Sequence, residues 1–304
     1  MILSLSPSDF NSAIAESFHQ LYQLPCKQPL RLFNMPVYYN ANELELPANP
    51  RVISLVPSQT ELLYHLELEE QVVGITRFCI HPDDWYRNKK RVGGTKDPHI
   101  DIIRQLRPDL VIANKEENRQ EDIALLARSF PIWVTDVATI SGALAMIMEA
   151  GDLLNRKNQA EKMVKQIAIS FESLAPKELQ GFTQQQSPSF DPAIRTAYLI
   201  WKDPWMTIGS DTFIHDVMAH AGFANVFAEG IRYPTITLEM LQQQNPELIL
   251  LSSEPYPFRT KHLEELRADF PGTKIRLVDG ELFSWYGSRL IHTASYLKDL
   301  RDSL

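Results

Sequence analysis

Two short stretches decide the fold: residues 106–112 read LRPDLVI, and residues 244–250 read QNPELIL. In each stretch, the end of a segment of helical period is followed by a proline and then by an almost uninterrupted apolar run. Proline lacks the amide hydrogen that a helix interior needs, and a continuous apolar run is typical of a strand covered on both faces. The recurrence predicts two related α/β units in one chain.

Working outward from these stretches, short β-branched runs alternate with segments of helical period from residue 51 onward, the pattern of parallel sheets covered by helices. The predicted strands are residues 51–56, 71–76, 109–113, 131–135, 196–201, 247–251 and 274–278. The predicted helices are residues 58–66, 98–106, 118–128, 141–154, 211–221, 238–244, 260–268 and 288–300.

One amphipathic helix is expected between the two halves. Its apolar residues recur at three- and four-residue steps, at Ala160, Val164, Ile167, Phe171 and Leu174. About 20 helical residues span roughly 30 Å, enough to connect two lobes as one rod. We therefore divide the chain into an N-terminal extension (1–46), an N-terminal α/β lobe (47–157), a connecting backbone helix (158–180) and a C-terminal α/β lobe (181–304). Within the extension, we expect a short helix at 9–22 and a hairpin at 35–46.

Composition narrows the classes of function. The 304 residues carry 30 basic and 38 acidic side chains, a net charge of -8, which argues against broad attraction to nucleic acid or anionic lipid. The sequence contains no run of about 18 apolar residues, so no membrane-spanning helix is predicted. The sequence also lacks a G-x-S-x-G elbow, a phosphate-binding glycine loop and an H-E-x-x-H pair. We expect a binding protein, not an enzyme, whose ligand is small or is another protein.

The position of the chain in the cell depends on its true beginning. The apolar start at Met1 lacks the basic flank and long apolar core of a secretory signal. The protein is therefore periplasmic or otherwise extracytoplasmic if a signal is missing from this sequence, and cytoplasmic if Met1 is the true start. Cys26 and Cys79 are too few for a disulfide framework.

Ligands of open α/β sheets bind beyond the carboxyl ends of the strands, so the cleft between the lobes is the expected site. Aromatic side chains there suit a flat macrocycle such as a corrin or porphyrin, or an aromatic siderophore. The charged loop at 115–118 favours instead a charged ligand or a ferric chelate. Four carboxylates are read either as acid–base groups or as solvated rim charges: Glu116, Glu117, Glu254 and Glu281. The candidate ligand-binding residues are Ser58, Phe78, His81, Thr95, Lys96, Lys115, Glu116, Trp201, Trp205, Trp285 and Tyr286.

No metal site is predicted. Cys79 and His81 form a Cys-x-His pair, and an imidazole at a cleft mouth can be an axial ligand to cobalt or iron, but no second cluster of ligands accompanies it. We expect Cys79 to pack as a small apolar residue.

Asp101 and Glu239 occupy equivalent positions in the repeat, each seven residues before its proline. An acid in the first turn of a helix is explained by the helix dipole alone. A second interpretation of this pair comes from a family resemblance.

Four motifs carry that resemblance: RVISLVPSQTELL at 51–63, VVGIT at 72–76, RVGGT at 91–95 and RPDLVIA at 107–113. In this order and spacing they resemble the metal-chelate and cobalamin receptors of ABC importers, which are class III, helical-backbone substrate-binding proteins. The resemblance implies two Rossmann-like lobes with parallel sheets, a single long backbone helix, little hinge motion and a ligand between the lobes. Compared with cobalamin receptors, Thr95 stands where a Trp is expected and His81 where a Tyr is expected.

The resemblance also implies partners. Receptors of this family dock on arginines of two permease subunits through one acid on each lobe, and by motif position these acids are Asp101 and Glu239. The implied ligand is a corrinoid or a ferric or haem-type chelate, carried as cargo with no cofactor of the protein's own. Neither nucleic acid nor direct membrane insertion is expected. The alternative is a cytoplasmic chelate-binding or chelate-processing protein that reuses the fold.

Overall fold

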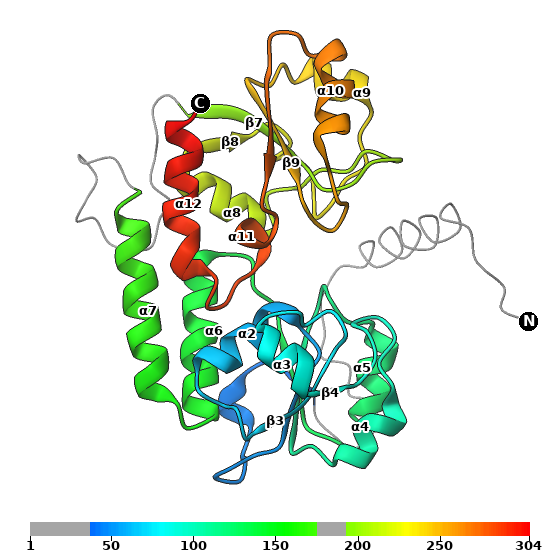
Figure 1. Ribbon diagram of the computed structural model, residues 1–304, viewed down its shortest axis with the longest axis vertical. Helices are drawn as coiled ribbons and strands as arrows, with labels where there is room; N and C mark the ends of the chain where they lie inside the picture. The colour runs from blue at the N-terminus through cyan, green and yellow to red at the C-terminus, as the bar shows by residue number, and fades with distance from the viewer. Residues whose placement is uncertain (1–36, 175–192) are drawn as a thin grey trace, which may run out of the picture.

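The apolar runs form two parallel sheets, one in each lobe of the computed structural model, which describes residues 37–174 and 193–304 (Figure 1). The N-terminal sheet has the strand order β1-β6-β5-β2-β3-β4. Its strands are β1 (Val37–Tyr38), β2 (Val52–Ser54), β3 (Val72–Ile75), β4 (Lys90–Arg91), β5 (Leu110–Asn114) and β6 (Ile132–Thr135). Its helices are η1 (Ala41–Glu43), α2 (Pro57–His65), α3 (Asp83–Asn88), α4 (Ile100–Leu106) and α5 (Gln120–Leu126).

The C-terminal lobe repeats the architecture with a parallel sheet in the order β10-β9-β7-β8. Its strands are β7 (Ile194–Leu199), β8 (Phe223–Asn225), β9 (Leu248–Ser252) and β10 (Lys274–Val278). Its helices are α8 (Phe213–His220), α9 (Leu238–Gln243), α10 (Thr260–Asp269), α11 (Glu281–Ser284) and α12 (Leu290–Asp302). The central strands β5 and β9 are buried at every residue, as their apolar runs predict.

The internal repeat is visible in atomic detail. In the N-terminal lobe, the Asp109 carboxylate accepts a hydrogen bond of 2.7 Å from the backbone of Arg51, whose side chain donates to the carbonyl of Leu106. In the C-terminal lobe, Glu247 accepts one of 2.9 Å from the backbone of Arg195. The Arg195 side chain donates to the carbonyl of Gln244 at the end of α9. The two helix–proline–strand units therefore share one scheme of stabilising contacts.

Two helices join the lobes. Helix α6 (Ile140–Leu153) turns sharply into α7 (Lys157–Glu172), and the two pack closely because a Cβ on Gly151 would lie only 2.4 Å from the Cβ of Ala160. Helix α7 buries the predicted stripe at Ala160, Ile167 and Phe171. It runs beside α12 of the C-terminal lobe (Figure 1). The predicted connecting helix is present and begins at Lys157; residues 175–180 of the prediction lie outside the described residues.

The backbone helices unite the lobes through a shared core. One apolar cluster contains Trp133 of the N-terminal lobe, Ile167 of α7, Leu297 of α12 and Tyr198 of the C-terminal lobe, all of them buried. A core that passes through both lobes resists a change in the angle between them. The expected fold class is confirmed: two α/β lobes with parallel sheets are joined by the long helix α7, against which α6 packs.

The predicted hairpin at 35–46 is wrong. Val37 and Tyr38 pair in parallel with Ile132 and Trp133 of β6, and η1 follows them. Two residues cannot form a stable hairpin alone, whereas the open edge of an existing sheet supplies ready hydrogen-bond partners. The helix expected at 9–22 lies outside the described residues. Among the residues described, no helix is both long and apolar enough to cross a membrane.

Candidate functional site

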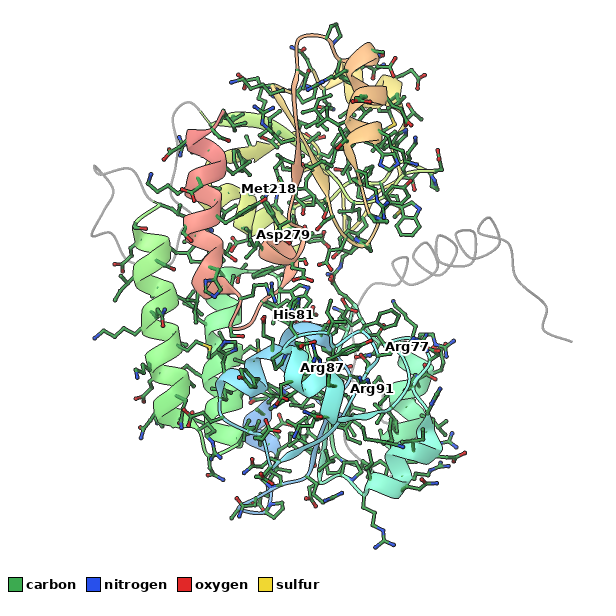
Figure 2. The ribbon with its side chains drawn as sticks, in the orientation of Figure 1. Arg77, His81, Arg87, Arg91, Met218 and Asp279 are labelled. Carbon is green, nitrogen blue, oxygen red and sulfur yellow. The ribbon has the colours of Figure 1, made fainter. Side chains whose placement is uncertain are left out.

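The loops that follow the strands of both sheets meet between the lobes. In the N-terminal lobe these are the start of α2 after β2, residues 76–82 after β3 and residues 115–118 after β5. In the C-terminal lobe the loop after β10 leads through α11 to α12. Figure 2 shows His81 at the edge of its lobe that faces the other lobe, with Asp279 across from it. Ligands of open α/β sheets bind beyond the carboxyl ends of the strands, so the candidate site lies between the lobes.

Arg289 contacts both lobes through its guanidinium group. Its Nε and Nη2 donate to the two carboxylate oxygens of Glu61 on α2, at 3.0 and 2.7 Å. Its Nη1 lies 2.8 Å from Oε2 of Glu281 in its own lobe. All three side chains are at least four-fifths buried. A two-pronged arginine–carboxylate contact of this kind is strong because both hydrogen bonds are charge-assisted.

Glu116 forms the second contact between the lobes. Its two carboxylate oxygens accept from Arg232 Nη1 and from the Tyr233 hydroxyl, each at 2.7 Å. Arg232 is held in turn by Asp211, whose Oδ2 lies 3.2 Å from its Nε. Burial raises the pKa of Glu116, while the Tyr233 hydrogen bond and the Arg232 charge oppose the rise. One predicted site residue is thus engaged by the opposite lobe.

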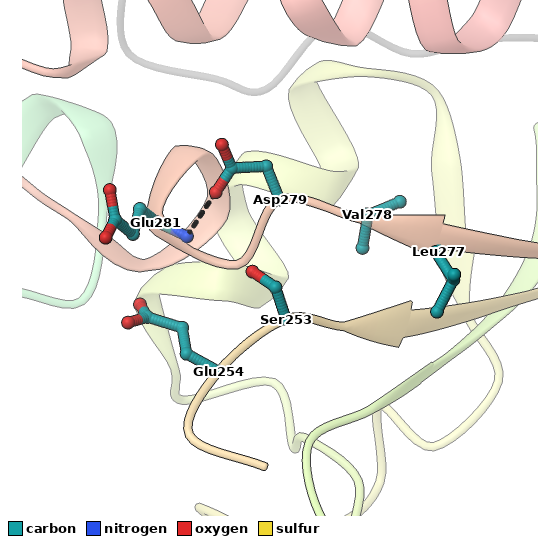
Figure 3. A pocket seen from close by; sticks show the side chains of 6 residues that line it. All are labelled: Ser253, Glu254, Leu277, Val278, Asp279 and Glu281. Atoms are coloured by element: carbon teal, nitrogen blue, oxygen red, sulfur yellow. Dashed lines mark hydrogen bonds between the residues drawn. The ribbon is translucent and has the colours of Figure 1, made fainter. Parts of the chain in front are cut away.

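A hollow of about 530 Å³ lies at the carboxyl ends of β9 and β10 (Figure 3). Its lining is acidic, with Glu254, Asp279 and Glu281 beside the hydroxyl of Ser253. Glu254 accepts hydrogen bonds from the Ser284 hydroxyl at 2.7 Å and from the Trp285 indole at 3.1 Å. Burial raises the pKa of Glu254 to about 7, so this carboxyl changes charge near neutral pH.

Trp285 and Tyr286 lie at the junction of the lobes and are more than nine-tenths buried. The Trp285 ring lies 5.7 Å from the ring of His81, and the Arg289 guanidinium is 4.6 Å from its centroid. The Tyr286 hydroxyl lies near Ser58 and Thr135 but makes no hydrogen bond of good geometry within the described part of the chain. Of the three candidates His81, Trp285 and Tyr286, the rings of His81 and Trp285 contact each other across the junction.

The remaining polar candidates surround the loop at 115–118. The amide of Asn118 donates to the carbonyl of Thr95 at 2.9 Å, and Lys96 Nζ donates to the carbonyl of Glu116 at 3.1 Å. Burial lowers the pKa of Lys96, against the opposing effect of the nearby acids. Lys115 pairs with Asp136 at 2.5 Å. These contacts fix the loop to its own lobe.

The other aromatic candidates are distributed unequally. Phe78 is half exposed, with the Arg77 guanidinium 5.1 Å from its ring. Trp201 is buried against Tyr256 in the C-terminal lobe, with ring centroids 5.5 Å apart. Trp205 stacks on Phe258 at 6.0 Å. Phe78 is therefore open to a partner, while Trp201 packs within its own lobe.

Asp101 and Glu239 lie in the first turns of α4 and α9, as the repeat predicts. Asp101 is 89% exposed and, within the described part of the chain, pairs with the neighbouring Arg104 at 3.3 Å. Glu239 is likewise exposed on its own lobe. Each acid is accessible to a partner.

Cys79 is fully buried, and its sulfur contacts the hydroxyls of Thr60 and Thr76 at 3.0 and 3.1 Å. Across residues 37–174 and 193–304, no three His, Cys, Asp or Glu side chains gather to hold a metal ion. His81 is instead directed to Glu281, 3.4 Å from its Nε2.

Sequence reasoning missed Glu61, Arg232, Tyr233 and Arg289. Arg289 lies only four residues after Trp285, so extending the loop after β10 to the start of α12 would have included it. Arg232 and Tyr233 follow no predicted strand, because β8 was not expected. Glu61 points from the middle of α2, beyond the strand end that the rule considers.

Comparison with known proteins agrees with this fold. The family described as periplasmic binding protein matches residues 52–273. A vitamin B12-binding protein of Pectobacterium atrosepticum is 24% identical over 203 residues, 66% of this chain and 71% of the relative. The apo periplasmic heme-binding protein RhuT from Roseiflexus sp. RS-1 has a TM-score of 0.67 at 19% identity, covering 83% of this chain and 97% of that one. The vitamin B12 binding protein BtuF of Vibrio cholerae has a TM-score of 0.63 at 18% identity, covering 84% and 99%.

Proposed function

Because the chain belongs to the periplasmic binding protein family, we propose that it holds a metal chelate between its lobes and delivers it to an ABC importer. The observation that carries the proposal is the meeting of both strand-end loop sets, with Glu116, Arg289 and Trp285 engaged from opposite lobes. The fold favours binding over catalysis. The chelate is cargo, and the protein acts outside the cytoplasmic membrane.

The ligand proposed is a corrinoid or a haem-type or other ferric chelate. Similar proteins are named for vitamin B12 and for heme, so both macrocycles are accommodated on this fold. At the junction, the rings of Trp285 and Tyr286 are more than nine-tenths buried and lie near buried polar atoms that lack a hydrogen bond in the described part of the chain. Within the described residues, Gln59 Oε1 and Ser288 Oγ are buried without a hydrogen-bond partner. A buried polar atom without a hydrogen bond is costly, so a ligand that opened the junction and bonded to these atoms would remove that cost.

Delivery would use the two exposed acids, Asp101 and Glu239. Each lies in the first turn of the helix that precedes the proline and the buried strand, β5 or β9, of its repeat unit, so one acid is presented by each lobe. Arginines on two permease subunits would complement them. No ligand contact is assigned to either acid.

The test is a fluorescence titration of the purified protein with cyanocobalamin, cobinamide, haem and a ferric catecholate, corrected for absorption by the chelate. We expect saturable quenching by one of them at micromolar or lower concentration. Trp285→Phe should remove most of that quenching, whereas Trp133→Phe, in the N-terminal core, should keep it. Absence of binding by all four chelates would overturn the proposed function.

A further inference from the structure

We infer that Arg289 is a positioning residue that holds the two lobes and the Trp285 ring in the arrangement required for ligand binding. The inference rests on the proposed function, since it assigns how that binding site is kept in place. Arg289 directly precedes α12, and its guanidinium contacts Glu61 of the other lobe, Glu281 of its own lobe and the face of Trp285.

The contacts form a closed circuit between the lobes. Starting in the N-terminal lobe, Glu61 binds Arg289, Arg289 binds Glu281, and Glu281 lies 3.4 Å from His81, which returns to the N-terminal lobe. Each acid in the circuit has a basic neighbour. A change in the position of either lobe would break at least two of these contacts together.

Trp285 lies inside this circuit. The Arg289 guanidinium is 4.6 Å from its ring centroid, the His81 ring approaches it at an interplanar angle of 69°, and its indole nitrogen donates to Glu254. The ring therefore has partners from both lobes and is only 8% exposed. Arg289 is therefore one of three side chains, with His81 and Glu254, that hold the orientation of this ring.

Arginine is the side chain that this place requires. Its planar fork binds the two oxygens of Glu61 while a third nitrogen reaches Glu281, and the same plane lies near the Trp285 ring. Lysine keeps the positive charge but has one small donor group, so it cannot make the two-pronged contact and approach both carboxylates. Arg289→Lys thus separates geometry from charge.

The experiment compares Arg289→Lys and Glu61→Gln with Arg267→Lys, an exposed arginine on α10 that serves as control. All variants are assayed at a temperature well below their thermal unfolding midpoints. Two quantities are measured. The first is the affinity for cyanocobalamin, cobinamide, haem and a ferric catecholate. The second is acrylamide quenching of the Trp285 emission, obtained by subtracting the matched Trp285→Phe protein. The quenching measurement needs no ligand.

We expect both test variants to bind the chelate about tenfold or more weakly, the loss expected for a charge-assisted contact, and to expose Trp285 to acrylamide. The double variant should lose little beyond either single change, because both remove one shared contact. Arg267→Lys should match the wild type in both measurements.

Two results would overturn the inference. One is unchanged affinity in Arg289→Lys with only a lower unfolding midpoint, which describes a purely stabilising residue. The other is unchanged acrylamide quenching of Trp285. If the wild type binds none of the chelates, the proposed function fails, and the quenching result still decides whether Arg289 positions Trp285.

Discussion

Replacing Glu254 with Gln should stabilise the protein at alkaline pH and leave it nearly unchanged at acidic pH. The pKa of Glu254 is raised from 4.5 to about 7, chiefly by burial, so the folded protein retains a proton that the unfolded chain releases. The protonated carboxyl stabilises the fold most fully below pH 4.5. That contribution is lost as pH rises toward 7, where the folded protein must hold a buried charge.

The size of this change in unfolding free energy follows from the pKa values of Glu254 in the unfolded and folded protein. A rise from 4.5 to about 7 corresponds, at 1.36 kcal/mol for each pH unit, to about 3 kcal/mol of unfolding free energy. Gln carries no charge at any of these pH values, and its carbonyl can still accept from Ser284 and Trp285. The free-energy difference between Glu254→Gln and wild type should therefore grow by about 3 kcal/mol between pH 4 and pH 8.

Urea unfolding at pH 4, 5, 6, 7 and 8 measures this difference. Glu265→Gln is a control of opposite sign, because the hydrogen bond from Lys202 lowers the pKa of Glu265. Its wild-type carboxylate contributes stability that is present above the unfolded pKa and is lost as pH falls, so that difference should change in the other direction. A Glu254→Gln difference that stays flat from pH 4 to pH 8 would refute the reasoning.

Two further predictions concern the two exposed acids and the close approach of the lobes at Gly287. Reversing the charge of both Asp101 and Glu239 should abolish association with the permease in a pull-down assay and leave chelate affinity unchanged; a collapse of chelate affinity would contradict the docking assignment. Gly287→Ala should weaken chelate binding in the fluorescence titration, because its Cβ would lie 2.9 Å from the backbone oxygen of Ser58 in the other lobe. Gly272→Ala, which meets nothing within 4 Å, should bind as the wild type does, and equal affinities of the two alanine variants would disprove the close approach.

The repeat made the fold predictable from local patterns. A proline between a helix and an apolar run identifies the same unit at β5 and β9, and both strands agree with their predicted ranges within one residue at either end. The stripe on α7 was equally clear, since sixteen residues give several turns of periodicity. By contrast, β1 has two residues, and its partner β6 lies almost a hundred positions later. Such a short strand carries no period of its own.

The positions of the candidate residues at the strand ends could be predicted from the sequence. Their hydrogen-bond and ion-pair partners in the other lobe could not. Strand-end reasoning found Glu116, His81 and Trp285, because the carboxyl ends of parallel strands share one edge of a sheet. It could not show that Arg232, 116 residues beyond Glu116, neutralises that carboxylate. Ion pairs between lobes depend on the angle that the backbone helices impose, and no local pattern encodes that angle.

The most direct test of the central claim is a crystal structure of the protein grown with the chelate that titrates most tightly, with the metal located by its anomalous scattering. We predict one metal peak between the lobes, beside the loops that carry Glu116 and Trp285. A peak elsewhere on the surface, or a fully loaded protein with the junction unchanged and unoccupied, would contradict the account.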